Sequence, residues 1–184
     1  MTNPCRVFGS TISSRRCKWI SALLTLAACT RAPDRGDVTV TVADPSRRAA
    51  IEDSVRTFAA AVSSAVSEQG PVAWHAYFAA SPAFFMASQG QLVFPTADAA
   101  SQGIDRLVHT LPHVSLTWGN PLRIDVLAPG LAMVAGPYHE MQTDSAGHEM
   151  RDDGFFTGIA EHERGGWRLR NAHWSSSSAP SPAR

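Results

Sequence analysis

Residues 165–176 read GGWRLRNAHWSS, and this stretch is the starting point for predicting the fold. A Gly-Gly pair favours a tight turn, and the run that follows it has the composition of a strand. Three long runs precede it at 114–126, 131–143 and 149–163, separated by turn signals at 129–130, 145–147 and 164–166. The second half of the chain is therefore predicted to form an antiparallel meander.

The first half predicts helices and one hairpin. Asp44-Pro45 predicts the start of a helix. Aspartate can accept hydrogen bonds from the unpaired amides of the first turn, and proline already has the φ angle required at the first helical position. Apolar residues at three-to-four spacing continue to the breaker pair Gly70-Pro71. The elements expected next are a short helix at 72–79, strands at 83–87 and 91–94, and a third helix at 96–111. Helices followed by strands indicate an α+β fold with three N-terminal helices packed on an antiparallel sheet.

The first 28 residues have the layout of an export signal. They carry Arg6, Arg15, Arg16 and Lys18 and no acidic residue, followed by an apolar run at 19–28. About ten apolar residues are too few for a transmembrane helix, which needs roughly 20. The remaining chain carries 12 arginines against 16 acidic residues, a net charge of about −4. It lacks the basic cluster that binding to nucleic acid requires.

The apolar run ends Leu26-Ala27-Ala28-Cys29, which resembles the lipobox of bacterial lipoproteins. The resemblance implies cleavage before Cys29, lipid on its sulfur and new amino terminus, and a place in the cell envelope. Thr30 in the next position implies the outer membrane if the cell has two membranes. The alternative is an ordinary signal peptide with an incidental cysteine.

The domain organisation follows from these signals. We expect a signal peptide at 1–28, a polar tether at 29–43, one domain at 44–176 and a disordered Ser/Pro-rich tail at 177–184. At 184 residues with 44% hydrophobic content, the chain has room for one sizeable core. The two other cysteines lie in the leader, so the mature chain is expected to have no disulfide.

Three segments resemble the nuclear transport factor 2 (NTF2-like) superfamily, and its SnoaL-like branch in particular. Residues 78–92 (FAASPAFFMASQGQL) look like its first hairpin, residues 96–107 like its third helix, and residues 166–175 like its last strand. The resemblance covers roughly 45–176 and implies a cone, in which helices close a pocket inside a curved sheet. Members of the superfamily include steroid isomerases, polyketide cyclases, dehydratases, ligand-binding domains and dimerisation domains.

The isomerase members carry a catalytic aspartate in the first hairpin, and this chain does not. Aligned on Gly90, the sequence has Ala87 at that position and Ser88 beside it. Neither side chain can act as a carboxylate base, so the steroid-isomerase mechanism lacks its proton acceptor.

Strand parity offers another candidate site. Side chains alternate between the two faces of a strand. On the last strand, one face is therefore expected to carry Trp167, Leu169, Asn171, His173 and Ser175. Pairing of Glu163 with Trp167 would put Thr157 opposite His173, and a three-residue turn at 145–147 would put Asp153 opposite His139. The resulting polar set is His139, Asp153, Thr157, Asn171 and His173.

This polar set suggests acid–base catalysis by a His139–Asp153 dyad, with His173 as a separate donor roughly 13 Å away. The alternatives are structural roles. His173 would form hydrogen bonds with the backbone or with Thr157, and Asp152 and Asp153 would be solvent-exposed residues near the start of a strand. A change of one residue in either turn would move the whole set to the other face.

Three classes of function remain open. The first is a pocket for a small apolar or amphipathic ligand, lined by Trp74, Tyr77, Phe85, Trp118 and Tyr138 with Thr157 and Asn171; it predicts a closed cavity of roughly 300 Å³ or more. The second is a cyclase, isomerase or dehydratase that uses His139, Asp153 and His173. The third is a dimerisation or interaction module that forms a homodimer. No phosphate-binding loop, nucleophile elbow or metal-ligand spacing occurs, so no cofactor and no metal are predicted.

Overall fold

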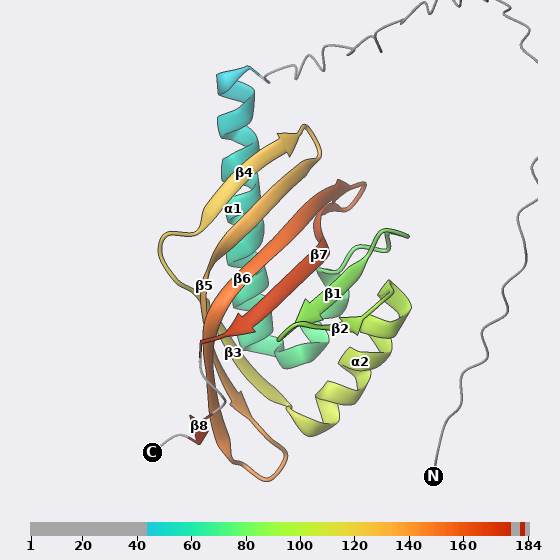
Figure 1. Ribbon diagram of the computed structural model, residues 1–184, viewed down its shortest axis with the longest axis vertical. Coiled ribbons are helices and arrows are strands. Elements are labelled where there is room, and N and C mark those ends of the chain that lie inside the picture. Colours follow the sequence, from blue (N-terminus) through green and yellow to red (C-terminus); the bar gives the residue numbers. More distant parts are fainter. Residues whose placement is uncertain (1–43, 178–180, 183–184) are drawn as a thin grey trace, which may run out of the picture. The chain divides into compact units, whose positions relative to one another are not determined.

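The computed structural model describes residues 44–177 and 181–182. The predicted export signal, the predicted lipidation site Cys29 and the predicted tether all lie outside the described residues. Figure 1 shows a twisted, unclosed sheet with helices on one of its faces. This is the α+β architecture expected from the sequence.

The first helix, α1, runs over Pro45–Gln69, as predicted. The side chain of Asp44 caps it by accepting a hydrogen bond from the backbone N–H of Ser46. It ends at Gly70, whose φ of 73° favours glycine. A Cβ at this position would lie 2.5 Å from the carbonyl oxygen of Pro112, so the helix end also packs tightly against the start of a strand.

Two of the three expected helices are α-helices in the described part of the chain. The segment expected as the second helix is a 3₁₀ helix, η1, over Gly70–Ala76. This segment begins a new helix, with Pro71 in its first turn. It has the tighter 3₁₀ hydrogen-bonding pattern, in which Tyr77 N–H donates to the carbonyl of Trp74 three residues earlier. The second α-helix, α2 (Ala97–Thr110), follows the hairpin and is capped by Thr96.

The sheet has the order β2-β1-β7-β6-β5-β3, with β4 also paired to β5 and β8 to β6. The strands are β1 (Phe85–Ser88), β2 (Gln91–Phe94), β3 (His113–Trp118), β4 (Arg123–Ala128), β5 (Leu131–Thr143), β6 (Glu149–Glu163), β7 (Gly166–Ser176) and β8 (Ser181–Pro182). All neighbours are antiparallel except β1 and β7, which are parallel. The prediction of a wholly antiparallel sheet is therefore wrong at this pair.

The single strand predicted over 114–126 is in fact two strands, β3 and β4. Each pairs with a different half of β5: β3 with Tyr138–Thr143, and β4 with Leu131–Ala135. Between them, Gly119 N–H donates to the Pro137 carbonyl at 2.8 Å. Pro121 has no N–H to continue the ladder. The interruption between β3 and β4 allows the chain to pair with both halves of β5.

A β-bulge in β7 changes which side chains face the core. Glu163 pairs with Gly166 and not with Trp167, and the register then shifts between Ile159 and Ala160. Arg170 is the extra residue, since Leu169 pairs with Ala160 and Asn171 with Ile159. The extra residue shifts the inward–outward alternation of the β7 side chains by one position.

The expectation of one shared face on the last strand is therefore wrong. Before the bulge, Trp167 and Leu169 are buried; after it, Ala172 is buried and His173 is exposed. The predicted pairs of Thr157 with His173 and of Ile159 with Asn171 nevertheless occur, because the bulge offsets the shorter turn.

The core lies between the inner face of the sheet and the helices. Its largest fully buried side chains include Tyr138, Phe156 and Leu116. Two indoles connect the sheet to α1: Trp118 Nε1 donates to the Ala59 carbonyl at 2.7 Å, and Trp167 Nε1 donates to the hydroxyl of a serine on α1 at 2.9 Å. Neither α-helix combines the length and apolar character needed to cross a membrane in the part of the chain described.

Residues 181 and 182 form β8 against Met150 and Arg151 of β6. Most of the tail predicted to be disordered, 177–184, lies outside the described residues. The pairing of β8 is possible because β7 ends at Ser176, opposite Gly154, and leaves the edge of β6 beyond it free to pair. Ser177 also continues the contact by donating its N–H to the Asp153 carbonyl at 2.7 Å.

Candidate functional site

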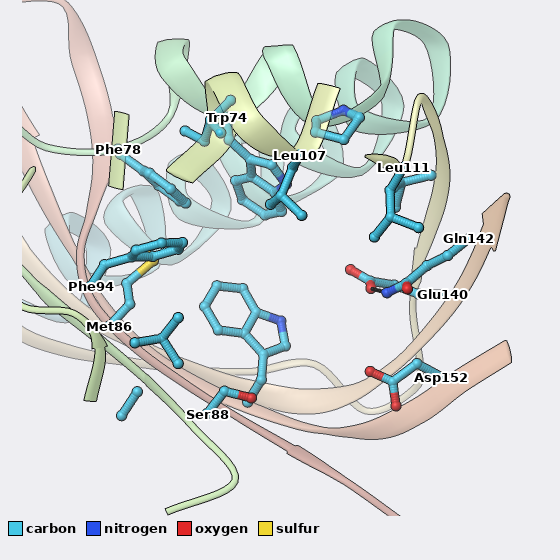
Figure 2. Close-up of a pocket in the computed structure, with 16 residues that line it drawn as sticks. Trp74, Phe78, Met86, Ser88, Phe94, Leu107, Leu111, Glu140, Gln142 and Asp152 are labelled. Carbon is cyan, nitrogen blue, oxygen red and sulfur yellow. Dashed lines mark hydrogen bonds between the residues drawn. The ribbon is translucent and has the colours of Figure 1, made fainter. Parts of the chain in front are cut away.

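A pocket of about 240 Å³ lies between η1, the β1–β2 hairpin, α2 and the inner face of the sheet. It is smaller than the cavity expected from the sequence, and it is partly open to solvent. Figure 2 shows Phe78 and Phe94 on one side and Glu140 and Asp152 on the other. The lining residues of the apolar walls are Pro71, Trp74, Phe78, Met86, Ala87, Val93, Phe94, Ile104, Leu107, Leu111, Val114 and Trp174.

The aromatic wall is held together by ring contacts. The ring of Trp74 stacks on Phe78 with centroids 5.1 Å apart. Trp174 meets Trp74 edge-on at 6.0 Å and contacts Phe156 of the core at 4.9 Å. Such pairs stabilise a fixed arrangement of rings beyond the burial of their area. The wall is therefore continuous with the hydrophobic core and is preformed.

The polar end of the pocket is made by Glu140, Gln142 and Asp152, with Ser88 on the hairpin side. Tyr138 is buried next to this end and reaches it through its hydroxyl group. Alternation in β5 brings the three β5 residues to the same face, because Tyr138, Glu140 and Gln142 are two positions apart. Asp152 is the direct partner of Glu140 on β6. Two carboxyls thus face one another across adjacent strands.

Glu140 has a strongly perturbed acidity. Burial raises its pKa from 4.5 to about 7, because the ionised form loses hydration. Gln142 opposes this by donating from Nε2 to Oε2 at 2.9 Å, while the nearby charge of Asp152 adds to the rise. Glu140 therefore changes its charge near neutral pH, which is the property expected of an acid–base group.

Asp152 and Tyr138 form the second part of the polar end. The Tyr138 hydroxyl donates to Oδ2 of Asp152 at 2.9 Å and lies 3.5 Å from the Ser176 hydroxyl. Burial raises the pKa of Tyr138 to about 12, and the neighbouring Asp152 contributes to the rise. The phenol therefore stays protonated and serves as a donor. Oδ1 of Asp152 is buried and has no hydrogen-bond partner among the described residues.

The predicted acid–base set lies on the opposite face of the sheet. His139 and Asp153 do meet, with Nδ1 2.9 Å from Oδ1, and 51% of the His139 side chain is exposed. The hydrogen bonds from His139 and Arg151 lower the pKa of Asp153. Thr157 and His173 are exposed on this outer face. Acid–base chemistry by these residues would take place outside the pocket.

Of the residues predicted to bind ligand, Trp74 lines the pocket. Tyr77 and Trp118 face α1 and donate to backbone carbonyls there. Phe85 is 46% exposed, because its neighbours on the hairpin strand take the inward positions. Asn171 also lies on the outer face, where its Nδ2 donates to the Ala83 carbonyl at 2.7 Å.

The carboxyl pair of Glu140 and Asp152 was not predicted, although the sequence contains a signal for it. The register that brings His139 to Asp153 also brings Glu140 to Asp152, on the other face. The outer pair was the one predicted, because a histidine beside a carboxylate is a common acid–base arrangement. Glu140 lies two positions after the aromatic Tyr138 and shares its face of the strand, so an inward Tyr138 assigns Glu140 and its partner Asp152 to the pocket side.

Among residues 44–177, no three His, Cys, Asp or Glu side chains are grouped as a metal site would require. The polar end of the pocket contains two carboxyls and one amide. These groups can form hydrogen bonds, pair with a positive charge and exchange protons.

The described fold is shared with solved structures of NTF2-like proteins. A candidate scytalone dehydratase from Novosphingobium aromaticivorans has a TM-score of 0.63 at 11% identity, over 76% of this chain and 91% of that one. A hexachlorocyclohexane dehydrochlorinase, LinA type 2, has a TM-score of 0.61 at 10% identity, over 77% and 94%. An NTF2-like superfamily protein from Salmonella enterica serovar Typhimurium has a TM-score of 0.55 at 14% identity, over 73% and 93%.

No protein-family model matches the sequence, and no curated protein matches it. At the identities above, the likeness to solved structures establishes the fold alone. The chemistry has to be argued from the residues of this chain, because one fold supports many functions.

Proposed function

We propose that residues 44–176 form a domain that binds a small, largely apolar or amphipathic molecule in the pocket beneath η1 and α2. The observation that carries the proposal is the pocket itself: an aromatic wall with a few polar groups at one end. This is the usual composition of a small-molecule site. Two proteins with the same fold are named as a dehydratase and a dehydrochlorinase, which supports a pocket for a small molecule.

Thermal unfolding in the presence of small apolar compounds tests this function. A ligand at 100 times its Kd stabilises the folded state by about 2.7 kcal/mol, which raises Tm by roughly 5 to 10 °C for a domain of this size. Leu107→Trp fills the pocket from α2 and should remove the shift. His109→Trp places the same ring on the exposed side of α2 and should leave the shift intact. If no compound raises the Tm of the parent protein, the proposal fails.

A second candidate function is acid–base catalysis within the same pocket, of the isomerase or dehydratase kind. It is favoured by Glu140, whose pKa of about 7 allows it to take up and release a proton near neutral pH. Tyr138 would act as a positioning residue, because its hydroxyl orients Asp152. The candidate residues are thus Glu140 and Asp152, in place of the outer-face histidines.

Deuterium exchange separates this candidate from binding alone. Apolar ketones in D₂O should exchange the hydrogens next to the carbonyl faster with the protein than without it, as followed by NMR. Glu140→Gln should remove the acceleration, and Asp153→Asn, the neighbouring carboxyl on the outer face, should not. Equal exchange rates with and without protein would leave binding as the sole function of the pocket.

We also propose that the mature protein is anchored in the cell envelope by lipid on Cys29. The support is the sequence alone: a basic leader, an apolar run of about ten residues and the small residues before Cys29. Cys29→Ala should move the protein out of the membrane fraction, while Cys17→Ala, within the leader, should not. Unchanged membrane association of Cys29→Ala would remove the anchoring proposal.

A further inference from the structure

The polar end of the pocket holds two carboxyl groups, and no cationic side chain among residues 44–177 pairs with either of them. Glu140 and Asp152 are cross-strand partners, so their Cβ atoms are expected about 4.5 to 5.5 Å apart. Neither residue takes part in an ion pair within residues 44–177. The pocket lining includes no lysine, arginine or histidine. Two carboxyls therefore share one partly buried site, and no described residue supplies a neutralising positive charge.

The hydrogen-bonding capacity of this end is also only half used. Gln142 donates to Oε2 of Glu140, and Tyr138 donates to Oδ2 of Asp152, each at 2.9 Å. Oδ1 of Asp152 is buried and lacks a donor in the part of the chain that the structure describes. A buried acceptor without a donor is unfavourable, so a ligand that donates a hydrogen bond to Oδ1 of Asp152 gains affinity by satisfying it.

We propose, on the premise that the pocket binds a small molecule as argued above, that this molecule is an apolar amine whose ammonium group lies between Glu140 and Asp152. An ammonium nitrogen offers several N–H donors and the opposite charge, and charge-assisted hydrogen bonds are the stronger kind. The apolar body of the molecule packs against Trp74 and Phe78 at the aromatic wall. An alcohol brings a single donor and no charge, and a carboxylate is repelled.

The pH dependence of binding follows from the groups around the nitrogen. The titratable side chains that face Glu140 are Asp152 on β6 and Tyr138 on β5; the lining residues from η1, α2, β1, β3 and β7 have no titratable side chain. Glu140 is largely protonated below its pKa of about 7 and has to ionise to pair with the ammonium group. Amine binding should therefore strengthen as the pH rises through about 7, with release of a proton near the midpoint.

Three probes with one skeleton test the proposal: naphthylmethylamine, naphthylmethanol and naphthoate. Isothermal titration of the full-length protein should give a Kd for the amine at least tenfold below that of the alcohol at a pH of about 8, and weakest binding for naphthoate. Tenfold corresponds to about 1.4 kcal/mol. The preference for the amine should shrink below pH 6, whereas the Kd of the alcohol should stay constant.

Two variants and a matched control sharpen the result. Glu140→Gln and Asp152→Asn should each abolish the preference for the amine while retaining the alcohol. Asp153→Asn changes the next carboxyl along β6, on the outer face, and should leave the preference intact. Equal Kd values for amine and alcohol, or tighter binding of naphthoate, would overturn the amine proposal and leave the pocket function standing. Absence of binding by all three probes would also overturn it, and the thermal screen then decides the pocket function separately.

Discussion

Replacing Glu140 with glutamine should stabilise the protein at neutral and alkaline pH. The perturbation is small in structure, because glutamine has nearly the same shape and keeps an oxygen that can accept the hydrogen bond from Gln142 Nε2. It removes only the ionisable proton. The substitution therefore isolates the cost of holding a carboxylate at the polar end of the pocket.

The magnitude follows from the difference in acidity between the two states. In the unfolded chain Glu140 ionises at its ordinary pKa of 4.5, and in the folded protein at about 7. Between these values the folded state binds more protons than the unfolded state, so stability falls as the pH rises. Above a pH of about 7 the loss is complete. At about 1.4 kcal/mol per pKa unit, it amounts to about 3 kcal/mol.

Urea unfolding followed by tryptophan fluorescence, from pH 4 to pH 8.5, measures this effect. The variant and the parent should have similar free energies of unfolding at pH 4, and the variant should gain up to about 3 kcal/mol by pH 8. Glu149→Gln, an exposed position at the start of β6, provides the control for loss of one negative charge. Parallel pH profiles for Glu140→Gln and the parent would refute the reasoning.

Four further predictions concern the core, the bulge, the outer face and the pocket. Phe156→Ala removes a ring that is 0% exposed and should cost about 3 to 5 kcal/mol in urea unfolding. Deletion of Arg170 removes only the extra residue and leaves Leu169 paired with Ala160 and Asn171 with Ile159, so later side chains keep their faces and cooperative urea unfolding should be retained. Asp153→Asn should show the opposite pH profile to Glu140→Gln: its destabilisation is present near neutral pH and disappears as the pH falls below the ordinary range of an aspartate, because hydrogen bonds lower the pKa of Asp153. Gly103→Ala places a Cβ against the ring of Phe94 and should weaken ligand binding by pushing that ring into the pocket; an unchanged Kd would contradict this.

The pKa values of Glu140 in the pocket and Asp153 on the outer face are shifted in opposite directions. Asp153 gains hydrogen bonds from exposed donors and is stabilised as the anion. Glu140 has a single donor and a dry environment, so its neutral form is favoured. Two neighbouring positions of one strand pair thus have opposite shifts because their side chains lie on opposite faces of the sheet.

The order of elements could be predicted from local sequence alone. The cap at Asp44, the breaker at Gly70-Pro71 and the turn signals between the long strands determine where the chain is helical and where it is extended. Strands β5 and β6 have the predicted bounds. These features depend on neighbours in the chain, and short-range patterns are sufficient to reveal them.

Only the tertiary structure decided which face each strand turns to the pocket. The register of β5 against β6 was correct, yet the polar pair chosen from it, His139 and Asp153, lies outside, whereas Glu140 and Asp152 lie inside. In β7, the bulge at Arg170 reverses the orientation of every later side chain. The physical reason is the period of two: one residue inserted anywhere along a strand exchanges its faces, and packing against distant segments determines where that residue is placed.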